Sequence, residues 1–133
     1  MVSKEFPEYT EEHAKAGLTA SLPGIETWNN QFQGYEIMVS VPEFTSVCPK
    51  SGLPDFGTLT ITYVPHKKCL ELKSLKFYFL AYRNLGIFYE NAVNRILQDI
   101  VKACQPVFCE VKGEFTPRGG MNSTVTAKYS KSR

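Results

Sequence analysis

The sequence predicts an α+β domain in which two helices cover one face of a four-stranded antiparallel sheet. Two observations support this fold class. In four segments apolar residues recur at every second position, which is the period of a half-buried strand. In two consecutive segments between them, apolar residues recur at helical spacing. The order is therefore β-β-α-α-β-β, and 133 residues suggest one domain, with an irregular segment at 1–33 and a core at 34–130.

The first two strands are expected at 35–41 and 58–63, where apolar and polar residues alternate. Pro65 should end the second strand, because proline cannot donate a hydrogen bond to a neighbouring strand. The sequence FTSVCPKSGLPDFG at 44–57 is rich in proline and glycine, so it is expected to be a loop. A short helix is expected ahead of the first strand, near 11–16.

The two long helices are expected in the middle of the chain. The first covers ELKSLKFYFLAYR at 71–83, and the second is an amphipathic segment at 88–104. A break at 84–86 separates them. Cys104 falls on the apolar stripe of the second helix and is expected to be a core thiol.

The last two strands are expected at 107–115 and 121–129, as a hairpin around a turn at 116–120. Cys109 lies on the apolar face of this hairpin, so packing alone explains it. A four-stranded sheet has two open edges, which favour pairing with other subunits unless they are covered. We therefore expect a homo-oligomer.

Composition excludes several function classes. The net charge is only +2, and the longest basic run within the core is Lys67-Lys68, so direct nucleic-acid binding is not expected. No apolar run approaches the ~20 residues of a membrane span, and the first residues do not resemble a signal peptide. We expect a cytoplasmic protein whose four cysteines are reduced. His66 and Cys69 form an isolated HxxC, which is too weak to predict a metal site.

Cys48 is the residue whose position most suggests chemistry. It precedes Pro49, which favours an extended backbone, and the following Gly52 and Pro54 favour a chain reversal. Such a reversal would bring Asp55 back toward the thiol. A thiol beside a carboxyl group can supply a nucleophile and a proton donor. Spacing alone, however, favours an incidental loop cysteine.

Charged residues elsewhere are individually weak signals. Glu71 and Glu90 each stand at the start of a predicted helix, where a carboxylate suits the helix dipole. Lys73 and Lys76 share a helix face, which is either a solvated surface or a pair of cations for a phosphorylated ligand. Arg118 precedes a Gly-Gly turn, and an arginine there can bind phosphate through two hydrogen bonds.

Together these segments closely resemble the QueF family of NADPH-dependent 7-cyano-7-deazaguanine reductases, which are nitrile reductases. The matching sequences are EFTSVCPKSGLPDFG, ELKSLKFYFLAYRN, GIFYENAVNRI, FTPRGG and the weaker IETWNN. The resemblance covers residues 25–129, in order and with similar spacing. Each motif occurs once, as in the single-module form of the family.

The resemblance implies an activity and a set of site residues. Members reduce the nitrile 7-cyano-7-deazaguanine to 7-aminomethyl-7-deazaguanine with NADPH, in the biosynthesis of queuosine, a tRNA modification. Cys48 matches the cysteine that forms a covalent thioimide, and so should have a lowered pKa. Asp55 matches the proton donor. The matching substrate contacts are Leu70, Glu71, Leu72, Tyr89 and Glu90, and the matching NADPH contacts are Lys73, Ser74, Lys76 and Arg118.

The resemblance also implies a fold and an assembly. The family has the tunnelling fold (T-fold), in which the sheets of several subunits join into a barrel and active sites lie between subunits. This agrees with the open sheet edges expected above. NADPH would not be held in the Rossmann manner, because the sequence contains no GxGxxG.

Two positions depart from the pattern of many members. Tyr89 stands where many have histidine, and a tyrosine is a poor proton carrier near neutral pH. Ala92 stands where some members have a cysteine that pairs with the nucleophile, so this chain should lack that disulfide.

Three alternatives remain open. A related amidinotransferase-type enzyme would keep Cys48 and Asp55 but lack the cofactor motif. A GTP cyclohydrolase of the same fold would need metal ligands or catalytic histidines. A non-catalytic pterin- or purine-binding module would explain Glu90, but not Cys48, Asp55 and the two lysines together.

Overall fold

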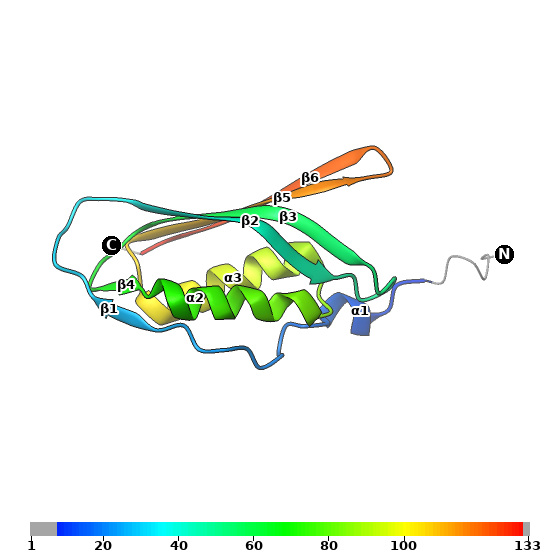
Figure 1. Cartoon of the computed structure of the whole chain (residues 1–133), viewed down its shortest axis with the longest axis horizontal. Coiled ribbons are helices and arrows are strands. Elements are labelled where there is room, and N and C mark those ends of the chain that lie inside the picture. Colours follow the sequence, from blue (N-terminus) through cyan, green and yellow to red (C-terminus); the bar gives the residue numbers. More distant parts are fainter. Residues whose placement is uncertain (1–7, 132–133) are drawn as a thin grey trace.

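The computed structural model describes residues 8–131 and has the predicted α+β class. One antiparallel sheet has the strand order β2-β3-β5-β6. Two helices lie along one face of this sheet (Figure 1). The strands are β2 (Ile37–Val47), β3 (Pro54–Val64), β5 (Phe108–Arg118) and β6 (Met121–Ser130), and the helices are α2 (Leu72–Leu80) and α3 (Tyr89–Cys104). The predicted order of these six elements is confirmed.

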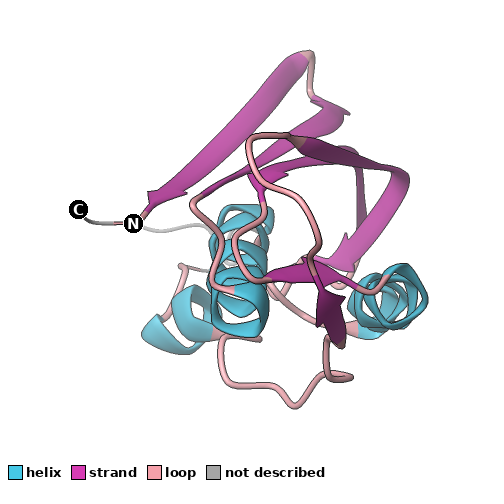
Figure 2. Cartoon of the chain, turned by 90° about the vertical axis from the view of Figure 1, so that its left-hand side faces the viewer, coloured by secondary structure: helices cyan, strands magenta, loops and turns pink. Residues whose placement is uncertain are grey.

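Two short strands form a second, smaller sheet that the sequence did not reveal. β1 (Thr27–Asn29) pairs antiparallel with β4 (Lys68–Leu70), next to the beginning of α2 (Figure 2). The expectation that residues 1–33 are irregular is therefore wrong at 27–29. Three residues are too few to show an alternation. The short helix expected near 11–16 is present as α1 (Glu11–Lys15).

Glu71 explains where α2 begins. Its carboxylate accepts hydrogen bonds from the backbone N–H groups of Lys73, at 3.1 Å, and Ser74, at 2.7 Å. These bonds satisfy donors that have no partner within the helix. After Leu80 the chain continues as the 3₁₀ turn η1 (Ala81–Asn84), which leads to the predicted break.

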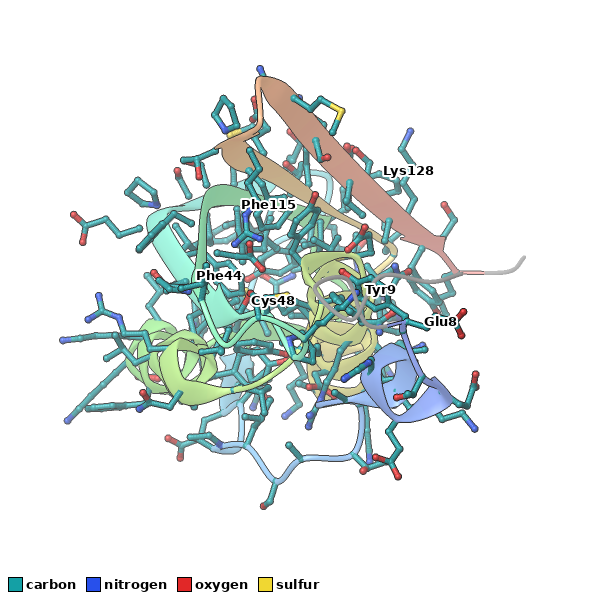
Figure 3. The ribbon with its side chains drawn as sticks, turned by 90° about the vertical axis from the view of Figure 1, so that its right-hand side faces the viewer. Glu8, Tyr9, Phe44, Cys48, Phe115 and Lys128 are labelled. Atoms are coloured by element: carbon teal, nitrogen blue, oxygen red, sulfur yellow. The ribbon has the colours of Figure 1, made fainter. Side chains whose placement is uncertain are left out.

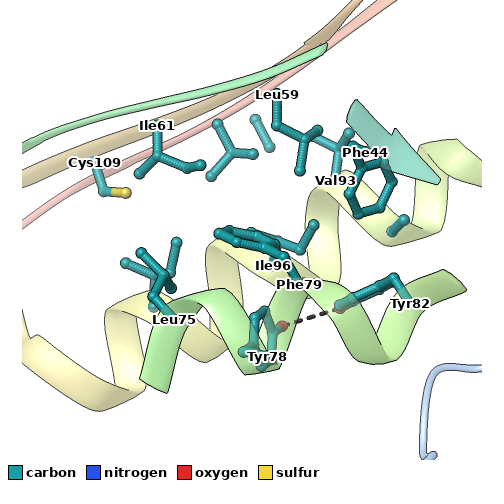
Figure 4. Close-up of a cluster of buried hydrophobic side chains, with 14 of the residues drawn as sticks. Phe44, Leu59, Ile61, Leu75, Tyr78, Phe79, Tyr82, Val93, Ile96 and Cys109 are labelled. Atoms are coloured by element: carbon teal, nitrogen blue, oxygen red, sulfur yellow. Dashed lines mark hydrogen bonds between the residues drawn. The ribbon is translucent and has the colours of Figure 1, made fainter. Parts of the chain in front are cut away.

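The core lies between the sheet and the two helices. Side chains from β3 face those of α2 and α3, and the tyrosine hydroxyls of Tyr78 and Tyr82 bond to each other at 2.9 Å (Figure 4). Tyr78 also donates to Asp99 at 2.6 Å, so this buried polar group has partners. Cys104 and Cys109 are 1% and 0% exposed, which confirms both as core thiols.

The predicted loop at 44–57 is much shorter than expected. Antiparallel pairing resumes beyond an irregularity after Val41 and continues to the pair Val47↔Pro54, so only residues 48–53 form the reversal. Likewise the turn expected at 116–120 shrinks to Gly119-Gly120, because Arg118 still pairs with Met121. Proline and glycine concealed the strand ends in both places, because these residues usually mark turns.

β2 and β6 are the edge strands of the larger sheet. The hairpin of β5 and β6 extends past the helices at one end of the molecule (Figure 1). Within residues 8–131, no helix has both the length and the apolar character that crossing a bilayer requires.

Candidate active site

Cys48 and Asp55 line one pocket of about 510 Å³, at the end of the sheet where β2 turns into β3. A pocket of this size suits a small organic ligand. Figure 3 views the molecule from this end and shows Cys48 with Tyr9 beside it. The complete lining is Tyr9, Cys48, Asp55, Phe88, Tyr89, Glu90, Asn91 and Arg118. The structure therefore brings together five of the residues that the sequence analysis placed in the site.

The β2–β3 reversal holds Cys48 in place. Its backbone N–H donates to the carbonyl oxygen of Leu53 at 2.9 Å, and its own carbonyl accepts from the N–H of Gly52 at 2.9 Å. Asp55 lies just beyond this turn, opposite Ser46 in the strand register. The predicted return of Asp55 toward the thiol is confirmed, since both residues line the same pocket.

The turn also favours the thiolate form of Cys48. Burial by itself raises the pKa of this thiol, because the side chain is only 7% exposed. Hydrogen bonds from the Ser51 hydroxyl and from the backbone N–H groups of Ser51 and Lys50 outweigh burial, so the net pKa lies below the ordinary value. By contrast, burial raises the pKa of Cys104 and of Cys109 to about 12. Cys48 is thus far better suited to act as a nucleophile than either core thiol.

The pKa of Asp55 is shifted in the opposite direction to that of Cys48. Burial raises the pKa of its carboxyl group, and the negative charge of Glu90 raises it further. Arg118 opposes both effects, because it forms an ion pair with Asp55 and also donates to the carbonyl of Pro54 at 3.2 Å. The net result is a raised pKa, which helps Asp55 to retain a proton that it can donate. A thiol with a lowered pKa and a carboxyl group with a raised pKa therefore share this pocket.

Tyr89 is held by an aromatic stack. Its ring lies 4.1 Å from that of Phe115, centroid to centroid, with the planes 23° apart. Phe115 in turn fits over glycines on two strands. A Cβ at Gly113 would lie 2.7 Å from the Phe115 ring, and one at Gly57 would lie 2.6 Å from it. The stack fixes the first turn of α3, and therefore Glu90, at the pocket.

The predicted cofactor residues of α2 lie elsewhere in the same chain. α2 begins at the opposite end of the sheet from the Cys48 turn (Figure 1). Lys73 and Ser74 line one depression, and Lys76 lines another, between α2 and β2. The Ser74 hydroxyl already accepts from Glu26 N–H at 2.8 Å and donates to the Glu71 carbonyl at 2.9 Å. None of these residues lines the Cys48 pocket.

Three predicted substrate contacts, Leu70, Glu71 and Leu72, are also outside that pocket, and Glu71 caps the start of α2. Leu70 is 2% exposed and belongs to the core, and its N–H donates to the Tyr63 hydroxyl at 3.0 Å. Leu72 is 62% exposed and borders the depression that contains Lys76. A single chain therefore divides the predicted site into two groups of residues.

Sequence reasoning missed several residues of the pocket. Phe88 and Asn91 flank the Tyr89-Glu90 pair inside the recognised segment GIFYENAVNRI, but no role in the site was predicted for them. Ser51 does not line the pocket but bonds to the Cys48 thiol, and nothing in the sequence indicated this contact. Tyr9 had no sequence signal, because it lies outside every recognised motif. Over residues 8–131, no group of three or more His, Cys, Asp or Glu side chains is arranged to hold a metal ion.

The chain also matches known proteins along most of its length. A family model described as "QueF-like protein" matches residues 54–133. The NADPH-dependent 7-cyano-7-deazaguanine reductase of Elusimicrobium minutum is 58% identical over 124 residues, covering 92% of this chain and 94% of that protein. The reductase of the same name from Chlorobaculum tepidum is 60% identical over 111 residues, covering 82% and 95%.

A solved structure supports the fold independently. The apo crystal structure of the archaeosine synthase QueF-Like superposes with a TM-score of 0.70 at 20% identity, over 77% of this chain and 100% of the other. At this level of identity the likeness concerns the fold alone.

Proposed function

The chain belongs to the family of NADPH-dependent 7-cyano-7-deazaguanine reductases, and we propose that its Cys48 pocket carries out the reduction of that nitrile to the primary amine. The observation that carries the proposal is the pairing of Cys48, whose pKa is lowered, with Asp55, whose pKa is raised. One group is prepared to attack and the other to donate a proton.

The first step is the addition of the Cys48 sulfur to the nitrile carbon. A C–S bond forms, one π bond of the C≡N group breaks, and the nitrogen receives a proton from Asp55. The product is a thioimide that contains all the atoms of the nitrile and of the thiol. A lowered pKa of Cys48 favours this step, because the thiolate is the attacking species.

NADPH supplies one hydride at each of two stages when it is bound. Cys48 would leave as the thiolate once the thioimide carbon has been reduced, which restores the nucleophile for the next turnover. In total, one nitrile, two NADPH and two protons give one amine and two NADP⁺.

Glu90 and Tyr89 are the proposed substrate contacts in this pocket. A deazaguanine presents N–H and amino donors, and the Glu90 carboxylate can accept hydrogen bonds from them. The ring stack with Phe115 holds Tyr89 in a fixed position. We assign Tyr89 to substrate positioning, because its ring is fixed at the pocket by the stack on Phe115.

The cofactor site is proposed to form between two copies of the chain. Lys73 and Lys76 take part in none of the ion pairs found within residues 8–131, so their ammonium groups are free to bind phosphate. Arg118, already in the Cys48 pocket, has a side chain that is 49% exposed and can add a further phosphate contact. The Ser74 hydroxyl oxygen can accept one more hydrogen bond, because only one of its two lone pairs is in use.

Assembly would join the two groups of predicted residues. β2 and β6 are edge strands, and edge strands offer unpaired backbone groups to a neighbouring subunit. We propose a T-fold barrel of several copies in which the start of α2 in one copy faces Cys48 of another. The residues brought there are Glu71, Leu72, Lys73, Ser74 and Lys76, while Leu70 stays in the core beneath them. The product would serve queuosine biosynthesis in the cytoplasm.

Two experiments test this proposal. The first is NADPH oxidation on addition of 7-cyano-7-deazaguanine, with Cys48→Ala as the control. Two NADPH per amine, lost in the variant, is the expected result, and no oxidation by the wild type would overturn the assignment.

The second experiment tests the shared site by mixing two inactive variants. Cys48→Ala and Lys73→Ala chains are co-expressed, so that some sites combine an intact Cys48 with an intact Lys73. Activity in the mixture above that of either variant alone is expected. An inactive mixture from two stable, co-assembled variants would mean that each site draws both residues from one chain.

A further inference from the structure

Tyr9 lines the Cys48 pocket and contacts both the turn that carries Cys48 and the residue that precedes α3. The Lys50 ammonium, in the turn that holds Cys48, lies 3.9 Å from the centroid of the Tyr9 ring. On the other side, the ring of Phe88, at the start of α3, lies 5.4 Å from the same centroid. Tyr9 is nevertheless 61% exposed. Part of its aromatic surface is therefore free to contact a ligand in the pocket.

The segment that carries Tyr9 is fastened to α3. Asn91 donates to the carbonyl of Ala14 at 2.7 Å. Arg95 donates to the carbonyls of Gly17, at 2.6 Å, and Ala20, at 2.5 Å. Charge-assisted hydrogen bonds of this kind are among the stronger ones in proteins. The segment is thus tied to the helix whose first turn carries Glu90.

Gly17 allows this segment to lie directly against the residues that lead into α3. Gly17 has φ +81°, and a Cβ there would lie 2.6 Å from Cβ of Ile87 and 2.7 Å from the carbonyl oxygen of Gly86. Any other residue would push the segment away from the entry to α3. Next to Tyr9, Thr10 and His13 exchange hydrogen bonds at 3.1 and 3.2 Å, which fix the start of α1.

We propose that residues 8–20 form a fixed arm of the active site and that Tyr9 is its substrate-positioning residue. The ring covers the outer side of the pocket and packs against the planar heterocycle, as aromatic rings do against flat π systems. It also limits water access to the Cys48 adduct, which water would otherwise hydrolyse. This inference rests on the proposed function for the identity of the heterocycle, but the cover over Cys48 can be tested without it.

The test compares Tyr9→Ala with Tyr9→Phe, and uses Glu12→Ala as the matched control. Glu12 is exposed on the same arm and does not line the pocket. The first measurement is the rate of Cys48 alkylation by iodoacetamide, followed by intact mass, which requires no catalytic activity. We expect faster alkylation in Tyr9→Ala only. An unchanged rate would overturn the inference, whether or not the protein reduces the nitrile.

The second measurement separates positioning from a merely structural role. Tyr9→Ala should raise KM for 7-cyano-7-deazaguanine about tenfold, the loss expected for one aromatic contact, and leave KM for NADPH unchanged. Tyr9→Phe should behave like the wild type, because it keeps the ring. Equal increases in both KM values, or a Phe variant as impaired as the Ala variant, would contradict the assigned role.

Discussion

Arg118 near the end of β5 forms an ion pair with Asp55 near the start of β3, across two adjacent strands. The two partners differ in environment, because the Asp55 side chain is 5% exposed and that of Arg118 is 49% exposed. The arginine therefore stands between solvent and a buried acid. This relationship couples a proposed phosphate contact to the proposed proton donor.

The first prediction concerns the pH dependence of the reaction. Arg118 lowers the pKa of Asp55, so Arg118→Gln should raise that pKa further. An acid must be protonated to donate, so the activity lost as pH rises should be lost at higher pH in the variant. The measurement is kcat against pH at saturating NADPH, with Lys112→Gln, on the same strand, as the control. If the loss of activity at high pH instead began at a lower pH in Arg118→Gln, the proposed role of the ion pair would be contradicted.

A second prediction is that Asp55→Asn gains stability while losing activity. The pKa of Asp55 is raised in the folded state, so deprotonation disfavours folding and stability falls as pH rises through that pKa. Asparagine removes this effect. At pH 7 the variant should have the larger free energy of unfolding in urea, and the difference should shrink as pH falls toward the ordinary value for Asp. A variant that is least stable at pH 7 relative to wild type would refute this reasoning.

The third prediction concerns which cysteines react. The pKa of Cys48 is lowered, whereas burial raises those of Cys104 and Cys109 to about 12. Iodoacetamide should therefore add once to the native chain and four times to the unfolded chain, since the sequence has four cysteines. Ser51→Ala should slow the native reaction near neutral pH but not well above the ordinary thiol pKa. A rate that is unchanged at neutral pH would remove Ser51 as a cause of the lowered pKa.

The fourth prediction tests the stack beneath Tyr89. Gly113→Ala would place a methyl group 2.7 Å from the Phe115 ring and 2.9 Å from Val93. Overpacking of this kind typically costs about 1–3 kcal/mol, and a displaced Phe115 should also raise KM for the nitrile through Tyr89. Gly24→Ala is the control, because nothing lies within 4 Å of its added Cβ. Normal stability and normal KM in Gly113→Ala would show that Phe115 does not position Tyr89.

The long elements were predictable because their patterns persist over many residues. The helix at 89–104 shows its apolar stripe over four turns, and the hairpin of β5 and β6 shows its alternation on both strands. β1 was not predictable, because three residues show no period. Its partner, β4, is as short. Only the folded chain brings these two segments together.

The site was predictable where reactive residues lie close together in the sequence and a turn joins them. Cys48 and Asp55 are seven residues apart, and a tight reversal between strands was enough to expect them together. Tyr89 and Glu90 required the resemblance to a family, since a long stretch of chain separates them from Cys48. Tyr9 could not be predicted at all. It reaches the pocket through backbone contacts of the arm with α3, and such contacts leave no pattern in the sequence.

The most direct measurement is the intact mass of the protein after incubation with 7-cyano-7-deazaguanine in the absence of NADPH. We predict an increase equal to the whole mass of the nitrile, because addition to Cys48 expels no atom, and no increase in Cys48→Ala. The same mass increase in the alanine variant would show that another residue captures the nitrile, and would contradict the central role given to Cys48.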